Sequence, residues 1–229
     1  MTFGEKILEF NRHLVYTGNL PEGIQIMNPF RDNPQVNYIT REFYTRFFSD
    51  NSKRTMMLGI NPGRFGAGAT GIPFTDTIRL NEQCCIHFEA FHTYEPSSSF
   101  VYEMIVAYGG VNEFYHKFFI SAICPLGFTI TNSRGKKVNY NYYDSKELSR
   151  MVYSFILEKM KEQMDFGIDP SRCYCLGTGR NEDFLVALNH EHKFFNKIIA
   201  LEHPRYIMQY KAKQKPYFIE KYLEAFRNF

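Results

Sequence analysis

A turn rich in glycine, asparagine and proline carries the residue types in this sequence that are best suited to hold a ligand. The apolar run 56–58 ends at Gly59, and Asn61 lies two residues beyond it. Such an abrupt change is typical of a buried strand that leaves a sheet, and open α/β sheets bind ligands just outside the carboxyl ends of their strands. Because glycine lets the backbone approach a ligand closely, the segment 59–74 predicts a site for a flat or anionic group.

Two phosphate-binding loops do not fit this segment. A Walker-type loop needs a lysine and then a serine or threonine after its second conserved glycine, and the segment 59–74 contains no lysine. A dinucleotide-binding turn runs from Gly-x-Gly-x-x-Gly straight into a helix, whereas Pro62 and Pro73 stiffen this loop instead. A glycine-rich surface turn without a ligand is the structural alternative.

The loop resembles the first motif of the uracil-DNA glycosylase superfamily, above all that of its single-strand-selective monofunctional members. Those enzymes carry Gly-Met-Asn-Pro-Gly-Pro-Phe-Gly and then Thr-Gly-Val-Pro-Phe. This chain has Gly-Ile-Asn-Pro-Gly-Arg-Phe-Gly at 59–66 and Thr-Gly-Ile-Pro-Phe at 70–74, with the same spacing. Further similar segments follow the family's order along nearly the whole chain: Gly23–Pro29 and Asn37–Arg41 upstream, and Cys124–Leu126, Gly177–Arg180 and His203-Pro204 downstream.

The resemblance implies an enzyme of DNA base-excision repair that hydrolyses the N-glycosidic bond of uracil or a related damaged base. In that reaction negative charge develops on an oxygen of the departing base, and water must reach an oxocarbenium-like sugar. Asn61 would position the water, and His203 would donate a hydrogen bond to the developing oxyanion. Phe74 would stack on the base once it has flipped out of the helix, and Gly63 and Ala67 would also line the base site.

Each of the three main residues also has a structural interpretation. Asn61 could be a turn residue that tolerates a left-handed backbone, His203 could cap the last helix, and Phe74 could pack in the core. Asn61 and His203 follow the ends of the first and last predicted strands. Because parallel strands bring their carboxyl ends to one edge of a sheet, we expect these two side chains to converge.

One position departs from the family in a way that bears on the substrate. The family carries an asparagine two residues before the cysteine of its Cys-Pro-Leu segment, and the amide of that asparagine reads the edge of uracil. Here the position is Ala122, whose methyl group cannot form those hydrogen bonds. Ser121 would point to the opposite face of the strand, and Asn112 and Asn132 are candidate replacements. The alternative function is therefore a nucleic-acid or nucleobase binding module with weak or no uracil excision.

The segment after His203 predicts contacts with DNA. The family reads His-Pro-Ser-Pro-Arg-Asn there and wedges into the duplex, whereas this chain reads His-Pro-Arg-Tyr-Ile-Met. Apolar and aromatic side chains unstack base steps, and basic residues interleaved with aromatics suit a phosphate backbone and its bases. A solvated helix face is the structural alternative. The expected DNA-binding residues are Arg205, Tyr206, Ile207, Met208 and Lys211.

Composition limits the remaining possibilities. The 229 residues suffice for one domain with a substantial core, so we expect a single domain over 1–229, and the net charge of +3 does not by itself argue for nucleic acid. The five cysteines show no Cys-x-x-Cys spacing, so we expect reduced thiols, no metal and no cofactor. No segment resembles a signal peptide or a membrane span. We therefore expect a cytoplasmic monomer that binds DNA and no membrane.

Hydrophobic periodicity and turn residues predict alternating helices and strands. Ser97–Ser99 are candidate caps for one helix, and Asp144 or Ser145 for another, with Glu147 placed for a capping box with Asp144. The pattern predicts an α/β fold of three layers, α/β/α, with a short and mostly parallel four-stranded central sheet, as the resemblance also implies. The expected helices cover 3–14, 37–48, 97–108, 144–164, 181–188 and 206–226, and the expected strands cover 55–60, 117–124, 172–176 and 197–201.

Overall fold

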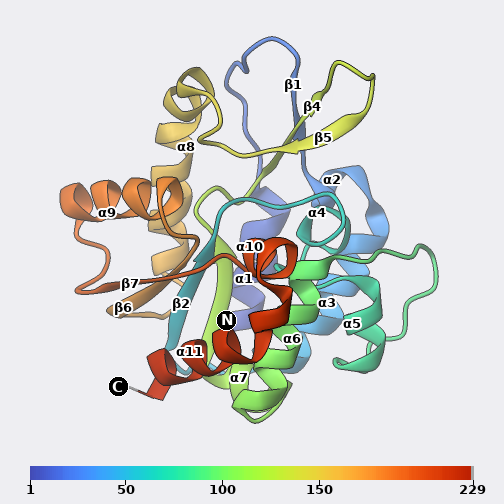
Figure 1. Cartoon of the computed structure of the whole chain (residues 1–229), viewed down its shortest axis with the longest axis vertical. Coiled ribbons are helices and arrows are strands. Elements are labelled where there is room, and N and C mark those ends of the chain that lie inside the picture. The colour runs from blue at the N-terminus through green and yellow to red at the C-terminus, as the bar shows by residue number, and fades with distance from the viewer. Residues whose placement is uncertain (228–229) are drawn as a thin grey trace.

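Four parallel strands form the central sheet of the protein, whose residues 1–227 are described by a computed structural model (Figure 1). The strands lie in the order β3-β2-β6-β7. All six residues of β2 are buried, as expected of a parallel strand that is covered on both faces. This confirms the predicted α/β fold with a parallel four-stranded sheet between helices. The strand bounds are β2 Arg54–Gly59, β3 Phe118–Ala122, β6 Ile168–Leu176 and β7 Ile198–Leu201.

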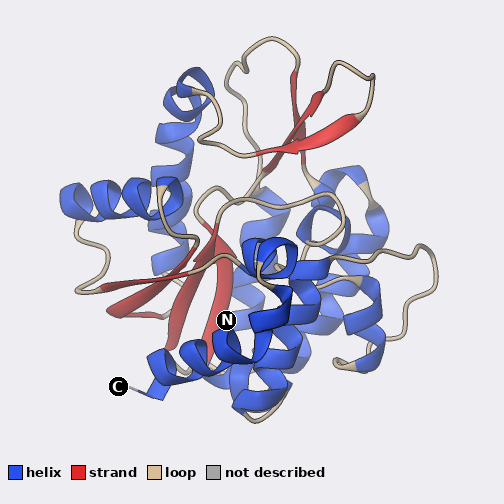
Figure 2. Cartoon of the chain, in the orientation of Figure 1, coloured by secondary structure: helices blue, strands red, loops and turns tan. Residues whose placement is uncertain are grey.

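Helices cover both faces of this sheet (Figure 2). The longer ones are α1 Phe3–His13, α3 Pro34–Phe47, α6 Pro96–Tyr108, α7 Val111–Lys117, α8 Lys146–Met164, α9 Arg180–His192, α10 Pro204–Tyr210 and α11 Lys215–Arg227. Four short helical segments complete the set, namely α2 Pro29–Asp32, α4 Ala67–Thr70, α5 Thr77–Glu82 and η1 Ala212–Gln214. Among residues 1–227, no helix combines the length and apolar character that a membrane crossing requires.

Two adjacent phenylalanines of β3 show how the layers are held together. Successive side chains of a strand point to opposite faces. The ring of Phe118 packs against Phe226 of α11, with centroids 4.8 Å apart, whereas Phe119 packs against Phe3 of α1, with centroids 5.4 Å apart. Burial of such large aromatic side chains provides most of the stabilisation that fixes helices on each face. The abundance of phenylalanine in the sequence therefore serves mainly the core.

An ion pair between a buried arginine and a half-exposed aspartate lies where the sheet begins. Arg54, the first residue of β2, is 0% exposed, and its guanidinium bonds the Asp50 carboxylate and lies over the rings of Phe3 and Phe48. This bond is the largest cause that lowers the pKa of Asp50 well below its ordinary value of 3.8. A depressed carboxyl pKa stabilises the fold fully above pH 3.8, and that contribution is lost as the pH falls below it.

We expect Asp50→Asn to lower the free energy of unfolding by about 2 kcal/mol, because it leaves a buried guanidinium charge without a counter-ion. Urea denaturation at neutral pH measures this change. Asp165→Asn is the matched control, since this exposed aspartate makes no ion pair with any residue of 1–227. Equal stability of the two variants would show that the Arg54 charge is compensated without Asp50.

A second sheet, which periodicity did not predict, stands above the central one in Figure 1. It is antiparallel, in the order β1-β4-β5, and consists of β1 Ile24–Met27, β4 Gly127–Thr131 and β5 Lys137–Tyr140. The turn between β4 and β5 places Gly135 at φ 70°, a left-handed conformation that glycine adopts without strain. These strands are short, but apolar and polar residues alternate in Phe-Thr-Ile-Thr at 128–131 and in Lys-Val-Asn-Tyr at 137–140, so this alternation and the turn together could have predicted the hairpin.

Several predicted helix ends also needed correction. The expected 206–226 helix is broken into α10, η1 and α11, because Pro216 lacks an amide donor and cannot continue a helix from the turn before it. The N-cap of α8 is Ser145, whose hydroxyl accepts from the Leu148 amide, so the Asp144 capping box does not form. The N-cap of α6 is Glu95 rather than a serine, and α7 was not predicted.

Candidate active site

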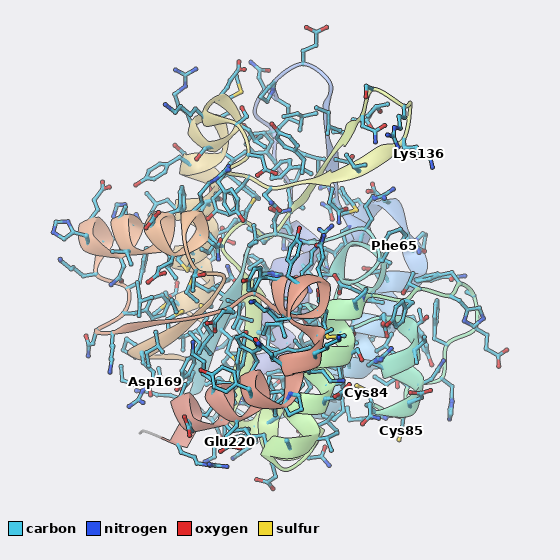
Figure 3. All side chains as sticks on the ribbon, in the orientation of Figure 1. Phe65, Cys84, Cys85, Lys136, Asp169 and Glu220 are labelled. Atoms are coloured by element: carbon cyan, nitrogen blue, oxygen red, sulfur yellow. The ribbon has the colours of Figure 1, made fainter. Side chains whose placement is uncertain are left out.

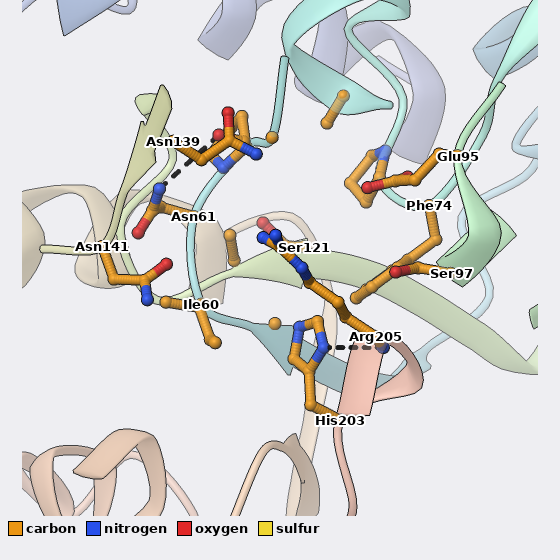
Figure 4. Close-up of a pocket in the computed structure, with 16 residues that line it drawn as sticks. Ile60, Asn61, Phe74, Glu95, Ser97, Ser121, Asn139, Asn141, His203 and Arg205 are labelled. Carbon is orange, nitrogen blue, oxygen red and sulfur yellow. Dashed lines mark hydrogen bonds between the residues drawn. The ribbon is translucent and has the colours of Figure 1, made fainter. Parts of the chain in front are cut away.

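A pocket opens at the carboxyl edge of the central sheet, with a cavity volume of ≈ 120 Å³ (Figure 4). The register aligns the ends of the strands that form it, since Gly59 of β2 pairs with Ala122 of β3 and Leu176 of β6 pairs with Leu201 of β7. The lining residues come from five separate parts of the chain: 59–63 with Ala67, Pro73 and Phe74; Glu95 and Ser97; Ser121 and Ala122; Asn139 and Asn141; His203 and Arg205.

Asn61 lies in this pocket, and its side-chain amide is held in one orientation. Its Oδ1 accepts a hydrogen bond from the Tyr142 amide at 3.1 Å, and its Nδ2 donates to the Tyr140 carbonyl at 3.2 Å. Its backbone is not among those of positive φ within 1–227, so it is not the left-handed turn residue considered above. Instead its side chain links the end of β2 to the last residue of β5 and to the segment that follows. A carboxamide oxygen has two acceptor positions, which leaves one for a water molecule.

His203 enters the pocket from the start of α10 (Figure 4). It is the N-cap of that helix, and its Nδ1 accepts a hydrogen bond from the Arg205 amide at 3.1 Å. An accepting Nδ1 carries no proton, so the neutral ring bears its proton on Nε2. Burial, followed by the Arg205 charge, lowers the pKa of His203 to about 4. His203 can therefore cap α10 and act as a hydrogen-bond donor at the same time, because capping uses Nδ1 and leaves Nε2–H of the neutral ring free to donate.

Phe74 adopts a backbone conformation that is unusual for its residue type. Its φ is 51°, which costs free energy for a side chain of this size. The Ser98 hydroxyl donates to its carbonyl at 2.7 Å, and its ring lies 5.5 Å from that of His203. A Cβ at Gly59 would lie 3.2 Å from the Phe74 ring, so a glycine leaves room for that ring beside the strand. The structure thus holds an aromatic face at the pocket wall.

No side-chain amide stands at the position of Ala122 in the pocket. The neighbouring Ser121 hydroxyl bonds the Gln163 side chain of α8, which places it on the other face of β3, as the strand geometry predicts. The candidate replacements Asn112 and Asn132 do not line the pocket. The side-chain Oδ1 of Asn132 instead accepts from the Arg134 and Lys136 amides of the β4–β5 turn.

Two other asparagines reach the pocket from the β5 end of the second sheet. Asn139 is the third residue of β5, and its Oδ1 accepts from the Arg64 amide at 3.1 Å. Asn141 follows β5 and lines the same cavity. Sequence reasoning missed both residues, because the strand that delivers them was not predicted. The alternating residues of the hairpin and the turn at Gly135 were the available signals.

Glu95 is a further pocket residue that sequence reasoning missed. Burial is the largest of the causes that raise the pKa of its carboxyl to about 7, followed by the nearby Asp76, while Arg205 acts in the opposite direction. Its Oε2 is buried and has no hydrogen-bond partner within residues 1–227. Gly63 and Ala67 of the glycine-rich loop also line the pocket, as the sequence predicted for the base site.

The predicted DNA-binding residues differ in their exposure. Arg205 lines the pocket, and Tyr206, the next residue in the chain, is 43% exposed. Ile207 is 0% exposed, which removes it from any surface that DNA could touch, because α10 turns this side chain into the core. Met208 is half-buried against the core, and Lys211 is the half-buried C-cap of α10 outside the pocket lining. Only Arg205 and Tyr206 thus combine exposure with closeness to the pocket.

The remaining chemical groups offer little support for a metal or a disulfide. Within the described part of the chain, no three His, Cys, Asp or Glu side chains are placed to hold a metal ion. The five cysteines are free among residues 1–227, with Cys84 buried and Cys85 exposed at the surface (Figure 3). The pocket lining presents amide, imidazole, carboxyl and guanidinium groups.

Known proteins similar to this chain share its arrangement. A model of the Uracil DNA glycosylase superfamily matches residues 45–227. The crystal structure of wild-type SMUG2 from Pedobacter heparinus matches with 53% sequence identity and a TM-score of 0.97, over 99% of this chain and 97% of that chain. No curated protein is similar enough to match. The resemblance predicted from the motifs is confirmed, and the chain belongs to the uracil-DNA glycosylase superfamily.

Proposed function

We propose that this chain is a monofunctional DNA glycosylase that hydrolyses the N-glycosidic bond of uracil or a related damaged base. One observation carries the proposal. His203 is held in the pocket as a neutral donor, because its Nδ1 is occupied by the Arg205 amide and its pKa is lowered to about 4. A neutral imidazole that is fixed before the reaction can donate to an oxyanion without reorganising as charge develops.

The departing base is stabilised from two directions in this mechanism. As the bond between base and sugar breaks, its electron pair moves onto the base and charge collects on a carbonyl oxygen. The Nε2–H of His203 donates to that oxygen, and the Phe74 ring, 5.5 Å from the imidazole, stacks on the face of the base. Stacking on an aromatic ring recovers part of the energy that is lost when a base leaves the helix.

Water reaches the sugar on the side of Asn61. The free acceptor position of its Oδ1 binds one hydrogen of the water, while the Tyr142 and Tyr140 bonds hold the amide still. A carboxamide cannot take up the proton of the water, so Asn61 is a positioning group. The departure of the base supplies most of the driving force, and the proton of the water passes to the released base anion, directly or through solvent. The pocket lining within 1–227 includes no lysine that could form a Schiff base with the sugar, which supports a monofunctional enzyme.

The DNA strand would cross the mouth of the pocket between two exposed aromatic rings. Tyr206 is an exposed residue in the first turn of α10. Phe65 is 52% exposed and projects from the glycine-rich loop (Figure 3). Arg205 supplies positive charge at the mouth. Phosphate contacts of this kind make affinity fall steeply with salt, and an inserted ring holds the gap that a flipped nucleotide leaves.

We expect Tyr206→Ala to slow base release from double-stranded DNA about 10-fold and from single strands much less, since only the duplex must be opened and base–aromatic stacking is lost there. Single-turnover rates on matched uracil-containing oligonucleotides measure the difference. Tyr217→Ala is the control, because Tyr217 is 65% exposed on α11 and does not line the pocket. A loss of equal size on both substrates would show that Tyr206 does not act as a wedge.

A panel of oligonucleotides tests the proposed function itself. It contains uracil, hydroxymethyluracil, hypoxanthine, xanthine or no lesion, each in single- and double-stranded form, and free base is quantified after incubation. We expect release from at least one lesion and none from undamaged DNA. A binding module without excision is the second candidate, because a methyl group stands at Ala122 where the family reads uracil. Retained DNA binding with no release from the whole panel would favour that candidate.

A further inference from the structure

The Glu95 carboxyl occupies a position that its structural roles do not explain. Glu95 is the N-cap residue of α6, yet within residues 1–227 its side chain makes no cap hydrogen bond with that helix. It forms no ion pair in the described part of the chain, and its buried Oε2 lacks a hydrogen-bond partner there. Buried polar atoms are almost always satisfied, and exceptions point to a ligand or a chemical role.

The glycine-rich loop is shaped around this carboxyl. A Cβ at Gly66 would collide with Oε2 of Glu95, and a Cβ at Gly63 would lie 3.5 Å from Oε1. The Glu95 amide is itself fixed, because it donates to Asp76 at 2.9 Å. In the view of Figure 4, Glu95 lies on the same side of the pocket as Phe74 and across from Asn61. The carboxyl thus borders the space that a base stacked on Phe74 would occupy.

A neutral carboxyl offers the same pair of groups as the amide that is absent at Ala122. Its carbonyl oxygen accepts one hydrogen bond and its hydroxyl donates one, whereas an ionised carboxylate only accepts. We propose that Glu95 is a base-reading residue, whose protonated carboxyl accepts from the ring N–H and donates to the adjacent carbonyl oxygen of a flipped uracil-type base. This inference rests on the proposed function, and it names the group that replaces the missing asparagine.

The surroundings of Glu95 favour the neutral carboxyl below about pH 7. Burial and Asp76, at the start of α5, raise the pKa of its carboxyl to about 7, and Arg205, at the start of α10, opposes them. Arg64 is the other charged residue of the neighbouring loop. His203, with a pKa of about 4, stays neutral above pH 6. Between pH 6 and 8.5, Glu95 is therefore the pocket group that changes charge.

The test compares Glu95→Gln with Glu95→Ala. Glutamine keeps one acceptor and one donor at every pH, and alanine keeps neither. The first measurement is affinity for a single-stranded oligonucleotide with one 2′-fluoro-2′-deoxyuridine, which resists cleavage, relative to the same strand with a tetrahydrofuran abasic site, which lacks the base edge that Glu95 would contact. We expect the preference for uracil to be retained in Glu95→Gln and to fall about 30-fold in Glu95→Ala, as two hydrogen bonds are lost.

The second measurement is the pH dependence of uracil binding and release. In the wild type both should weaken as the pH rises through about 7, where the carboxyl loses its proton. In Glu95→Gln both should stay level over that range, which a purely structural role would not produce. Ala122→Asn added to Glu95→Ala should restore the preference for uracil. Glu89→Gln is the control, because this exposed glutamate of the preceding loop does not line the pocket.

Opposite results would overturn the inference. If uracil release rises with pH and Glu95→Gln is as slow as Glu95→Ala, the carboxylate acts in its ionised form and does not read the base edge. If Glu95→Ala keeps the full preference for the uncleavable uracil strand, Glu95 does not contact the base at all. If the proposed function fails, the wild type releases no base from any strand. The affinities of the Glu95 variants for the uncleavable uracil strand still decide the role of Glu95 in that case.

Discussion

His203→Asn should slow base release by about 10²- to 10³-fold, which is the usual cost of removing one preorganised donor to an oxyanion. Asparagine is a good N-cap, so this variant keeps a capping acceptor for the Arg205 amide but has no donor at the position of Nε2. Single-turnover kinetics on a uracil-containing oligonucleotide give the rate. The melting temperature should stay close to that of the wild type, so the loss can be assigned to chemistry.

A comparison with His203→Ala completes this prediction. Alanine removes both the cap and the donor, so we expect a rate as low as that of His203→Asn, together with a loss of about 1 kcal/mol in the free energy of unfolding. If His203→Asn retained the wild-type rate while His203→Ala did not, the histidine would act only as the cap of α10. That result would remove the donor from the mechanism.

The neutral state of His203 also predicts how stability depends on pH. Its pKa is lowered from 6.5 in the unfolded chain to about 4 in the folded protein, so the unfolded state binds a proton more readily between these values. Stability should therefore decline as the pH falls from 6.5 towards 4, and this part of the decline should be absent in His203→Asn. Thermal denaturation over that range provides the measurement.

Asn61→Ala should lower the rate of base release by about 100-fold, since the water would no longer be held in line with the sugar. It should also reduce the free energy of unfolding by about 2 kcal/mol, because the Tyr142 amide and the Tyr140 carbonyl lose their partners. The rate is measured under single-turnover conditions at a temperature where both proteins are fully folded. This separates the two effects.

Asn61→Asp is the informative companion variant. A carboxylate still accepts from the Tyr142 amide and can take a proton from water, but it cannot donate to the Tyr140 carbonyl. We expect it to be less stable than the wild type and yet clearly more active than Asn61→Ala. Both rates are compared at a temperature where all three proteins are fully folded. If Asn61→Asp were then as slow as Asn61→Ala, only the amide donor would matter, and water positioning by Oδ1 would be contradicted.

The central sheet could be predicted from the sequence because its signals are local. A strand buried on both faces reads as an apolar run that ends in turn residues, as at Gly59 and, for the predicted strand 117–124, at Pro125. The convergence of Asn61 and His203 followed from the same logic, since parallel strands share a carboxyl edge. Both residues line the observed pocket.

The rest of the pocket depends on contacts between distant segments, which no local pattern reveals. Asn139 and Asn141 arrive with a short antiparallel hairpin. The alternating residues at 128–131 and 137–140 could have predicted its strands, but not their place beside the pocket. Glu95 precedes α6 in a loop, and only the fold shows that its carboxyl is buried against Gly66. The burial of Ile207 depends on how the short helix α10 packs against the core. The sequence predicted one unbroken helix through Pro216, so the buried face of α10 could not be assigned.

The most direct test of the proposed mechanism uses the double variant Asn61→Ala, His203→Asn. Single-turnover release of uracil from a single-stranded oligonucleotide is measured alongside affinity for the uncleavable 2′-fluoro strand, with the wild type in parallel. We expect the wild type to release uracil and the double variant to fall to the background rate, with affinity changed by less than about 10-fold, because these residues act mainly in the transition state. Equal release by both proteins would contradict the proposed mechanism.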